Sequence, residues 1–464
     1  MRITSLVCAS LLIAVSLQAP AASLDFLSPE SREELAYSTG IQAFIYAYPL
    51  LHVNQFRHAF HSPSAPSYRG PANEFNHFRQ LVTSSTKSSA ASPNNDTLYT
   101  LTWVDLSDQP VVVETPAMGD RYFTIQLADF YATNFGDIGT RHNKGAAGKY
   151  LIVGPDWKGT PPADITQVFR SPTPWAMTLL RILVENPGDL EEVHVLQDRF
   201  RLTTLDGSPL PDVDPGRLPA VPDSGKQAAQ LWAVINRELT ANPPPASDSA
   251  LVDQFALVGI GPGLSEDISQ LDASIQKGLA RAAEAGMKMV VEAADDITGG
   301  VAYNGWGYPR ADIGRYGTDF LYRAGVTRMG LMANEPAEAT YLSLYTDTDG
   351  NAMQGTKQYR LQFSADNLPP ARAFWSVTVY DSSDYTLVDN IIGRYSIGDR
   401  TEGIRYADDG SLTIHISQST PEDGQRSNWL PAPAGDFYLI LRVYLPEQSV
   451  IDQEWQPPGL EVVQ

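Results

Sequence analysis

Cysteine is nearly absent from this chain, since Cys8 is the only one among 464 residues. It lies in the N-terminal segment "MRITSLVCASLLIAVSLQAPAAS", where one arginine precedes an apolar run that ends at Leu17. This pattern is typical of a secretory signal peptide and predicts cleavage after Ala21. The mature chain would then contain no disulfide, no thiolate metal site and no cysteine nucleophile. An exported chain without cysteine suits the bacterial periplasm.

Basic residues are in the minority. The chain has 33 Lys and Arg against 54 Asp and Glu, which gives a formal net charge of −21 at pH 7. Such a charge repels nucleic acids and anionic membranes at long range, so neither is an expected partner, and solubility is the simplest interpretation of the charge. After the signal peptide there is no uninterrupted apolar run of about eighteen residues, so we expect no membrane-spanning helix.

Several familiar catalytic and cofactor motifs are missing. The sequence contains no G-x-S-x-G, no H-E-x-x-H and no Walker A loop. "GIGPG" (259–263) lacks the third glycine of a dinucleotide-binding fingerprint and is predicted to be a loop between helices. "DTDGN" (347–351) resembles half of a calcium loop, but Gly350 comes too early and Gln358 stands where a bidentate Glu is required. We predict a hairpin turn there, and no cofactor or metal site follows from these motifs.

The length and the pattern of elements indicate several domains. A chain of 464 residues is too long for one hydrophobic core, and its 43% hydrophobic content supports large packed interiors. After Pro29, a 3.6-residue apolar stripe predicts a helix over 30–60. Short β-branched and aromatic runs predict a β-sandwich-like module over 61–165, helices over 166–330, and strands again over 331–455. The expected fold class is a multidomain α+β protein.

Two strands of the C-terminal region have distinct patterns. In "SLTIHIS" (411–417) apolar and polar residues alternate, which predicts one buried face. "FYLILRVYL" (437–445) is apolar on both faces except at Arg442, as expected of a central strand. An unpaired buried guanidinium costs several kcal/mol, so Arg442 should have a carboxylate or carbonyl partner, and a structural salt bridge is the preferred interpretation.

Long ordered strings of the sequence resemble a known family. "SPNNDTLYTLTWVDL", "GDRYFTIQLADFYATNFGDIGTR" and "YLIVGPDW" resemble the domain of unknown function 1254. "GTDFLYRAGV", "AFWSVTVYD", "NIIGRYSIG", "DGSLTIHIS" and "NWLPAPAGDFYLILRVYLP" resemble its usual C-terminal companion, the domain of unknown function 1214. The resemblance implies an exported protein with a sandwich-like N-terminal module, helical segments and a jelly-roll-like β-sandwich at the C-terminus. It implies no reaction and no catalytic residues.

The densest polar cluster lies in the first β-rich region, around "SPNNDTLYTL" (92–101). The cluster and the neighbouring strands contain Asn94, Asn95, Asp96, Tyr99, Trp103, Tyr122, Gln126, Asp129, Tyr131, Asn134 and Arg141. The structural interpretation is an Asx-turn at a strand entrance and aromatic residues in the core. The functional interpretation is a ligand site in which amides and aromatic rings bind a polar or flat ligand. If Asp96 and Asp129 were close together, they could share a proton and act as acid and base. The candidate substrate-binding residues here are Asn95, Tyr99, Trp103, Tyr131, Asn134 and Arg141.

A second group of candidates lies in the C-terminal region. Arg394, in "GRYSIG", could bind an anionic ligand, and Trp375 and Trp429 could line a site or fill the core. His58 and His61 have a spacing that can place two imidazoles on one helix face, but a surface pair is the preferred interpretation. His142 next to Arg141 is either a solvated loop residue or a neutral base.

Two functions remain open from the sequence. The first is a periplasmic hydrolase or lyase that acts by acid–base chemistry on a small organic or carbohydrate-like substrate, with Asp96 and Asp129 as proton carriers. The alternative is a non-catalytic ligand-binding or cell-envelope protein that uses the same amides and aromatic rings to line a pocket. The sequence does not determine the oligomeric state.

Overall fold

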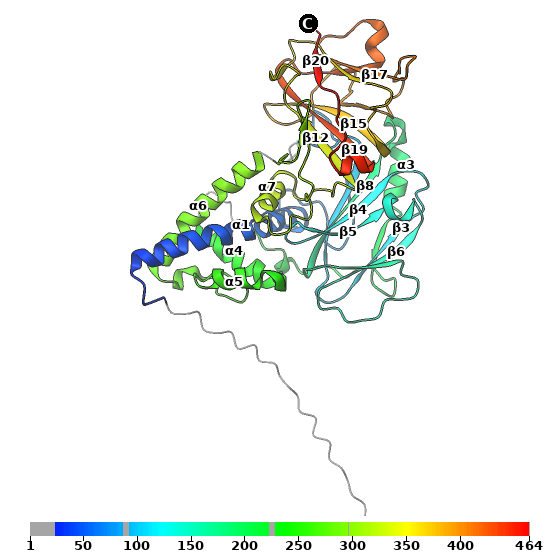
Figure 1. Cartoon of the computed structure of the whole chain (residues 1–464). Coiled ribbons are helices and arrows are strands. Elements are labelled where there is room, and N and C mark those ends of the chain that lie inside the picture. The colour runs from blue at the N-terminus through cyan, green and yellow to red at the C-terminus, as the bar shows by residue number, and fades with distance from the viewer. Residues whose placement is uncertain (1–23, 87–91, 222–227, 296, 464) are drawn as a thin grey trace, which may run out of the picture.

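The structure is a computed structural model that describes residues 24–86, 92–221, 228–295 and 297–463. The expected signal peptide, residues 1–21, lies outside these ranges. Figure 1 shows two β-rich regions, one above the other, with a group of helices beside the lower one. Helices and mainly antiparallel sheets are both extensive, so the expected mixed fold class is confirmed at this level.

The helices gather around the long helix α1 (Pro29–His61). The hydroxyl of Ser28 caps this helix by accepting the N–H of Ser31 at 3.2 Å, and Pro29 stands in the first turn, where an N–H is not needed. The other members are α4 (Ala228–Ala241), α5 (Ser249–Ala256), α6 (Ala273–Asp295) and α7 (Phe320–Gly330). Helix α6 approaches α1 closely at Gly278, where a Cβ atom would lie 2.3 Å from the Glu33 carbonyl oxygen.

The lower β-rich region contains two sheets. The larger is antiparallel, in the order β1 (Asn76–His77), β2 (Thr97–Asp105), β8 (Trp175–Leu183), β4 (Phe123–Asp129) and β5 (Asn134–Gly139). The smaller has the order β7 (Gln167–Arg170), β6 (Gly148–Val153), β3 (Val111–Thr115) and β9 (Arg201–Thr203), with β6 and β7 parallel. Short helices α2 (Thr140–Asn143) and α3 (Leu190–Gln197) follow β5 and β8.

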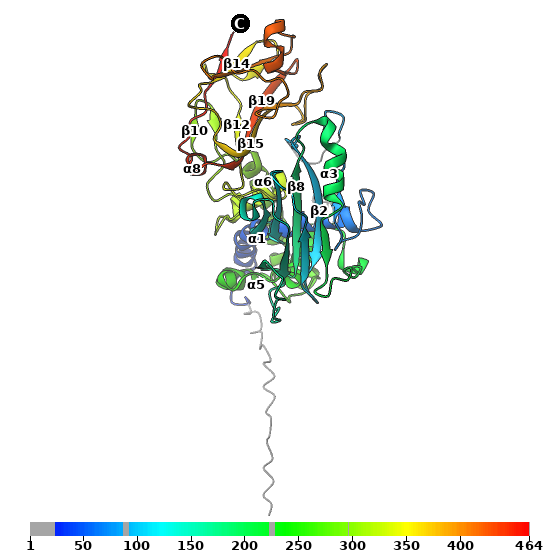
Figure 2. The ribbon, with the colours of Figure 1, turned by 90° about the vertical axis from the view of Figure 1, so that its right-hand side faces the viewer.

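Both faces of the five-stranded sheet are buried. One face contributes Trp103 and Met177 to a core shared with the helices. The other contributes Ile125 and Leu180 to a core shared with the smaller sheet and α3, and Figure 2 shows α1 and α3 on opposite sides of this sheet. Since strands buried on both faces lack a clear period of two, β8 could not be distinguished from a buried helix by its pattern. This explains why β8 lies within 166–330, where helices are expected, and the short strands β7 and β9 lie in the same range.

The upper region is the C-terminal module, which also contains two sheets. The larger has the order β10 (Ala302–Tyr303), β11 (Trp306–Gly307), β12 (Ala339–Leu344), β19 (Asp436–Pro446), β15 (Ala371–Asp381) and β16 (Ser396–Gly398), with β13 (Met353–Gln354) also paired to β19. The smaller has the order β18 (Trp429–Pro431), β17 (Leu412–Ser417), β14 (Tyr359–Phe363) and β20 (Leu460–Val462). One core joins the two sheets. Helix α8 (Gln448–Ile451) follows β19.

The two strand patterns of this module are confirmed. Leu412, Ile414 and Ile416 of β17 are buried, while Thr413 and His415 are partly exposed. Strand β19 pairs with β12 on one side and β15 on the other, as expected of a central strand.

The motifs interpreted as loops are loops. Residues 259–263 lie between α5 and α6. Asp347 accepts the N–H groups of Asp349 at 3.0 Å and Asn351 at 2.9 Å, which closes a tight turn beside the antiparallel bridge between Thr346 and Ala352.

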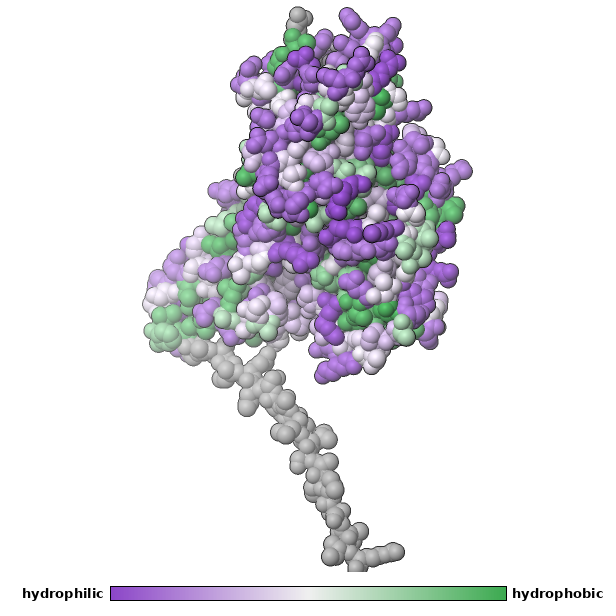
Figure 3. Space-filling view, turned by 45° about the vertical axis from the view of Figure 1, so that its right-hand side comes forward, coloured by the Kyte–Doolittle hydropathy of each residue, from purple (hydrophilic) through white to green (hydrophobic). Residues whose placement is uncertain are grey.

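The surface agrees with the acidic composition. Figure 3 shows hydrophilic residues over most of one face, in keeping with the net charge of −21. Within the described ranges, the helices do not combine the length and apolar character that crossing a membrane requires.

Candidate functional site at the module junction

Asp96 connects the two β-rich regions. The Asx-turn at the strand entrance is closed by Asn94, whose Oδ1 accepts the N–H groups of Asp96 at 2.7 Å and Thr97 at 3.0 Å. The Asp96 carboxylate instead accepts the hydroxyl of Ser376 at 2.7 Å and a guanidinium N–H of Arg400 at 2.9 Å. Since Ser376 and Arg400 belong to the C-terminal module, Asp96 is part of the contact between the modules.

Asp129 lies at the other end of the same sheet. It accepts the N–H groups of Tyr131 and Thr133, both at 2.9 Å, and burial raises its pKa to about 6. Thr97 pairs with Leu183 and Asp129 pairs with Ala176, which are seven residues apart on β8, or roughly 23 Å. The hypothesis that Asp96 and Asp129 share a proton is therefore wrong, because an extended strand separates them.

Four of the expected ligand-binding residues make packing and structural contacts. The ring of Tyr99 faces the Arg181 guanidinium at 5.3 Å, and Trp103 is buried edge-on to His61. The Tyr131 hydroxyl donates to the Asn242 carbonyl at 2.9 Å. The remaining one, Asn95, donates its amide to the Val82 carbonyl at 2.5 Å.

The C-terminal candidates also stabilise their own module. Trp375 and Trp429 are 4% and 2% exposed, and the indole N–H of Trp429 donates to the Ser417 carbonyl at 3.0 Å. Arg394 donates to the carbonyls of Ser427 at 2.9 Å and Trp429 at 2.8 Å. Its guanidinium is thus engaged by the backbone rather than directed at a ligand.

Arg442 has a partner, as its burial requires. It donates to the Ser92 carbonyl at 2.9 Å and to the Thr378 hydroxyl at 3.1 Å. A carboxylate or a carbonyl is the expected partner of Arg442, and the structure shows a carbonyl. The salt bridge preferred from the sequence is not formed.

The histidine pair is not a surface pair. His61 is 1% exposed, its Nδ1 lies 2.8 Å from the Gly70 carbonyl, and burial lowers its pKa to about 4. His58 is partly buried and has its Nδ1 2.7 Å from the Leu218 carbonyl. In the described part of the chain, no three His, Cys, Asp or Glu side chains are grouped as metal ligands.

A polar cavity lies where the five-stranded sheet meets the segment before β12. Its lining residues are Thr124, Gln126, Asn134, Gly136, Asp137, Arg141, Asn334, Glu335 and Glu338. The space open to a water-sized sphere is about 10 Å³, which is room for about one water molecule. Of the residues expected to bind substrate, Asn134 and Arg141 line this cavity.

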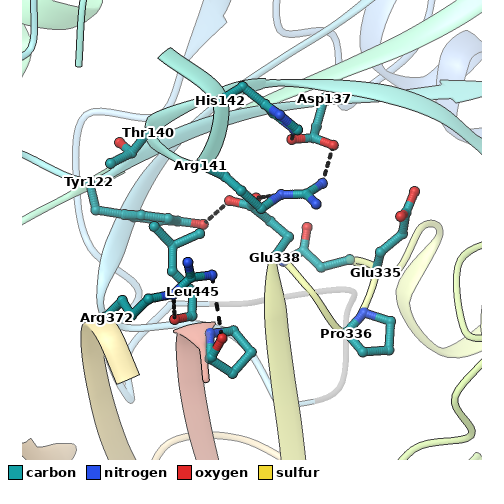
Figure 4. Close-up of polar contacts among 12 residues, drawn as sticks. Tyr122, Asp137, Thr140, Arg141, His142, Glu335, Pro336, Glu338, Arg372 and Leu445 are labelled. Carbon is teal, nitrogen blue, oxygen red and sulfur yellow. Dashed lines mark hydrogen bonds and ion pairs between the residues drawn. The ribbon is translucent and has the colours of Figure 1, made fainter. Parts of the chain in front are cut away.

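Two carboxylates meet one guanidinium at this cavity (Figure 4). Nε of Arg141 donates to Oε2 of Glu338 at 2.9 Å, and the other side of the same guanidinium donates to Asp137. Nε2 of His142 lies 2.7 Å from Oδ2 of Asp137, and the Tyr122 hydroxyl donates to Oε1 of Glu338 at 2.7 Å. We refer to Asp137, Arg141, His142 and Glu338 as the junction cluster.

Burial differs within the junction cluster. The Glu338 side chain is 4% exposed, and burial, followed by the nearby charge of Asp137, raises its pKa. The His142 ring is 45% exposed and the Asp137 side chain 12%. A buried carboxyl with a raised pKa and a half-exposed imidazole close to a second carboxyl therefore lie on opposite sides of Arg141.

Amides form the base of the cavity. Nε2 of Gln126 donates to the side-chain oxygen of Asn134 at 2.9 Å. Arg181, which is 5% exposed, donates to the side-chain oxygens of Gln126 at 2.8 Å and Asn334 at 2.9 Å. These contacts hold the lining side chains in place.

Sequence reasoning missed Asp137 and Glu338. Asp137 could have been singled out only as a carboxylate four residues before Arg141, because the two residues lie in β5 and α2 rather than in one helix. Glu338 had no comparable indication, because it comes from a segment nearly two hundred residues later in the chain.

The fold and the site define a protein of two β-rich modules with an acidic, arginine-containing cavity between them. The family described as "Protein of unknown function (DUF1254)" matches residues 72–204, and "Protein of unknown function (DUF1214)" matches residues 338–448. The chain belongs to the family that joins these two modules, DUF1254 at the N-terminal side and DUF1214 at the C-terminal side.

Two solved structures are similar. The VPA0106 protein from Vibrio parahaemolyticus has 24% sequence identity and a TM-score of 0.72, and the match covers 92% of this chain and 100% of that chain. An uncharacterized protein from Burkholderia cenocepacia has 12% identity and a TM-score of 0.45, over 94% of this chain and 93% of that chain. The first similarity supports the fold alone. No curated protein matches the chain.

Proposed function

We propose that the protein is a periplasmic acid–base enzyme, a hydrolase or lyase that acts on a small organic or carbohydrate-like substrate at the junction cluster. The observation that carries this proposal is the pair of carboxylates, Asp137 and Glu338, bound to one guanidinium beside a half-exposed imidazole.

Each member of the junction cluster has a role in this chemistry. Glu338, whose pKa burial raises, donates a proton to the leaving group. His142, oriented by Asp137, accepts a proton from a water molecule or from a substrate carbon. Arg141 stabilises the negative charge that develops between them. The exposed side of His142 is where the reacting end of a substrate reaches the cluster.

Export and finer fold details belong to the same proposal. The N-terminal pattern supports secretion to the periplasm, with residues 1–21 removed. The pairs of sheets with shared cores support a sandwich-like N-terminal module and a jelly-roll-like C-terminal module. No cofactor is part of the proposed reaction.

The alternative, a non-catalytic ligand-binding or cell-envelope protein, has one observation in its favour. Every charged group of the junction cluster already has a partner within the protein, and the cavity has room for only about one water molecule. In this alternative, the cluster only holds the two modules together.

The experiment is a substrate panel with the purified mature protein. p-Nitrophenyl esters and glycosides report hydrolysis, and polyuronates report elimination through the absorbance of the unsaturated product. Glu338→Gln should lower kcat by at least about 100-fold on any substrate that is turned over, because Gln cannot donate the proton. His142→Gln should lower kcat by a similar factor, because glutamine cannot accept the proton.

Asp105→Asn is the matched control. Asp105 is a buried carboxylate paired with an arginine, Arg217, but it lies at the far end of β2 from the cavity. Its replacement should lower stability and leave kcat unchanged. Turnover that persists in folded Glu338→Gln and His142→Gln variants would reject the assignment, and binding without turnover across the panel would favour the alternative.

A further inference from the structure

Tyrosines stand in a row on one side of the large C-terminal sheet. Tyr345 directly follows β12 and lies opposite Tyr438 of the neighbouring strand β19. On its other side, Tyr438 pairs with Tyr380 of β15. The rings of Tyr345 and Tyr438 have centroids 5.2 Å apart at 22°, and those of Tyr438 and Tyr380 are 5.3 Å apart at 23°. Tyr380 and Tyr438 are buried, whereas Tyr345 is 52% exposed. This tyrosine row (Tyr345, Tyr438, Tyr380) therefore ends in an aromatic ring at the surface.

Tyr385 adds a second exposed ring beside the row. Its centroid lies 6.0 Å from that of Tyr438, and its side chain is 49% exposed. Its backbone has φ 60°, a left-handed conformation that glycine or asparagine adopts at lower cost than tyrosine. Hydrogen bonds from its N–H to Asp381 and from Ser92 to its carbonyl, both 2.9 Å, hold this conformation. The chain thus has a tyrosine with a half-exposed ring at a position where glycine or asparagine would carry less backbone strain.

A groove with hydrogen-bond acceptors lies where β15 ends and β19 begins. It has a volume of about 290 Å³ and is lined by Asp381, Ser382, Ser383, Gly435 and Asp436. Asp436 is two residues before Tyr438 on β19, so both side chains stand on the same side of the sheet. Tyr385 belongs to the turn that follows Asp381 and comes two residues after Ser383, so the groove lies beside this exposed ring.

This combination matches a neutral sugar ring. The C–H face of a pyranose packs on an aromatic ring, and its hydroxyl groups donate to carboxylates. An acidic sugar would be repelled by Asp381 and Asp436. An organic cation is a poorer match, because the row is a parallel stack rather than a cage and the guanidinium of Arg442 already lies 5.5 Å from the Tyr380 ring.

We propose that the groove lined by Asp381, Ser383 and Asp436, together with the neighbouring ring of Tyr385, binds a neutral pyranose unit of a carbohydrate. This site is separate from the junction cluster. Glu338 directly precedes β12 and Tyr345 directly follows it, a separation of roughly 20 Å along an extended strand. The proposal therefore holds whether or not the junction cluster is catalytic.

The test is carbohydrate binding by the purified mature protein. Binding to polysaccharides is measured by the retardation of the protein in native gels that contain a soluble neutral polysaccharide, such as xyloglucan, glycogen or mixed-linkage β-glucan. Contact with free sugars is measured by saturation-transfer NMR with cellobiose and maltose. The wild type should be retarded by at least one neutral polysaccharide and not by polygalacturonate. Tyr385→Asn should weaken binding at least about tenfold and keep or raise the melting temperature, since asparagine tolerates the left-handed backbone. Asp436→Ala should weaken binding as well.

Tyr68→Ala is the matched control, because Tyr68 is also exposed, at 42%, but lies in the loop after α1. It should bind like the wild type. The proposal is overturned if no neutral carbohydrate binds, if Tyr385→Asn and Asp436→Ala both retain full binding, or if polygalacturonate is the preferred ligand. A loss of binding in Tyr385→Asn together with a lower melting temperature would also overturn it, since the tyrosine would then be structural.

Discussion

Three acidic side chains show that the environment, and not the residue type, decides what a carboxyl group does. Asp96 has a guanidinium and a hydroxyl as partners, and it serves as a connection between modules. Asp129 closes a turn with backbone N–H groups, and burial raises its pKa to about 6. Glu338 is buried between a phenol and a guanidinium. Glu338 lines the cavity at the module junction, and it is the one of the three that the sequence does not single out.

Asp129 should make stability depend on pH. Its folded-state pKa of about 6 lies above the ordinary value of 3.8, so between these values the folded protein binds the proton more tightly than the unfolded chain does. The free energy of unfolding should therefore fall as the pH rises from about 4 to 6. Asp129→Asn keeps an oxygen for the Tyr131 and Thr133 N–H groups but cannot ionise. We expect the free energy of unfolding of the variant to be about 1 to 3 kcal/mol higher than that of the wild type at pH 7. At pH 4 the difference should be much smaller.

Urea unfolding at pH 4 and pH 7 measures this difference. A stability difference of the same size at both pH values would show that Asp129 does not titrate as described.

At the scale of elements, close backbone approach determines how α1 and α6 pack. Gly278 of α6 lies against the backbone of α1, where a Cβ atom would come 2.3 Å from the Glu33 carbonyl and 2.7 Å from Cβ of Ala36. The periodicity of α6 predicts a helix, but it does not reveal that this glycine is a contact point. In the same way, the apolar pattern of β8 does not reveal a strand, because both of its faces are buried.

Gly278→Ala tests this contact. Alanine raises helix propensity by about 1 kcal/mol, but here its methyl group would displace the backbone of α1. We expect a net loss of about 1 to 3 kcal/mol in the free energy of unfolding, measured with urea. Gly330, at the end of α7, has open space around it, so Gly330→Ala should be neutral or slightly stabilising. If both substitutions stabilised the protein equally, the close approach of α1 and α6 would be refuted.

For the whole molecule, one face of the five-stranded sheet is shared between two neighbours. Trp103 and Met177 pack on the helices, while Tyr122 and Leu183 contact Phe374 and other residues of the C-terminal module. The polar residues near this boundary, such as Asp96, therefore connect modules that are distant in sequence. This explains why a dense polar cluster in the sequence does not become a single site.

The pair of Asp96 and Arg400 should couple the modules energetically. The Asp96 side chain is 2% exposed, and Asp96→Ala should cost about 3 kcal/mol, since it leaves the guanidinium of Arg400 without its carboxylate. A double-mutant cycle with Arg400→Ala should give a coupling energy of about 1 to 3 kcal/mol by urea unfolding. The exposed pair Arg360 and Glu461 should give less than about 1 kcal/mol in the same cycle. Equal coupling in both cycles would mean that burial adds nothing to the Asp96 contact.

The sequence by itself determined features that depend on local patterns and composition. It predicted α1 from an apolar stripe, the exposed and buried sides of β17, the central position of β19 and the turn at Asp347, because each of these depends on residues close together in the chain. Its resemblance to the two modules was also correct.

Only the tertiary structure decided which polar groups meet. It separated Asp96 from Asp129 along the full length of a sheet, and it brought Glu338 to Arg141 across the module junction. It also placed Tyr345 and Tyr385 beside the same buried tyrosine. The physical reason is that strand pairing and module packing join distant segments in a register that no local pattern encodes.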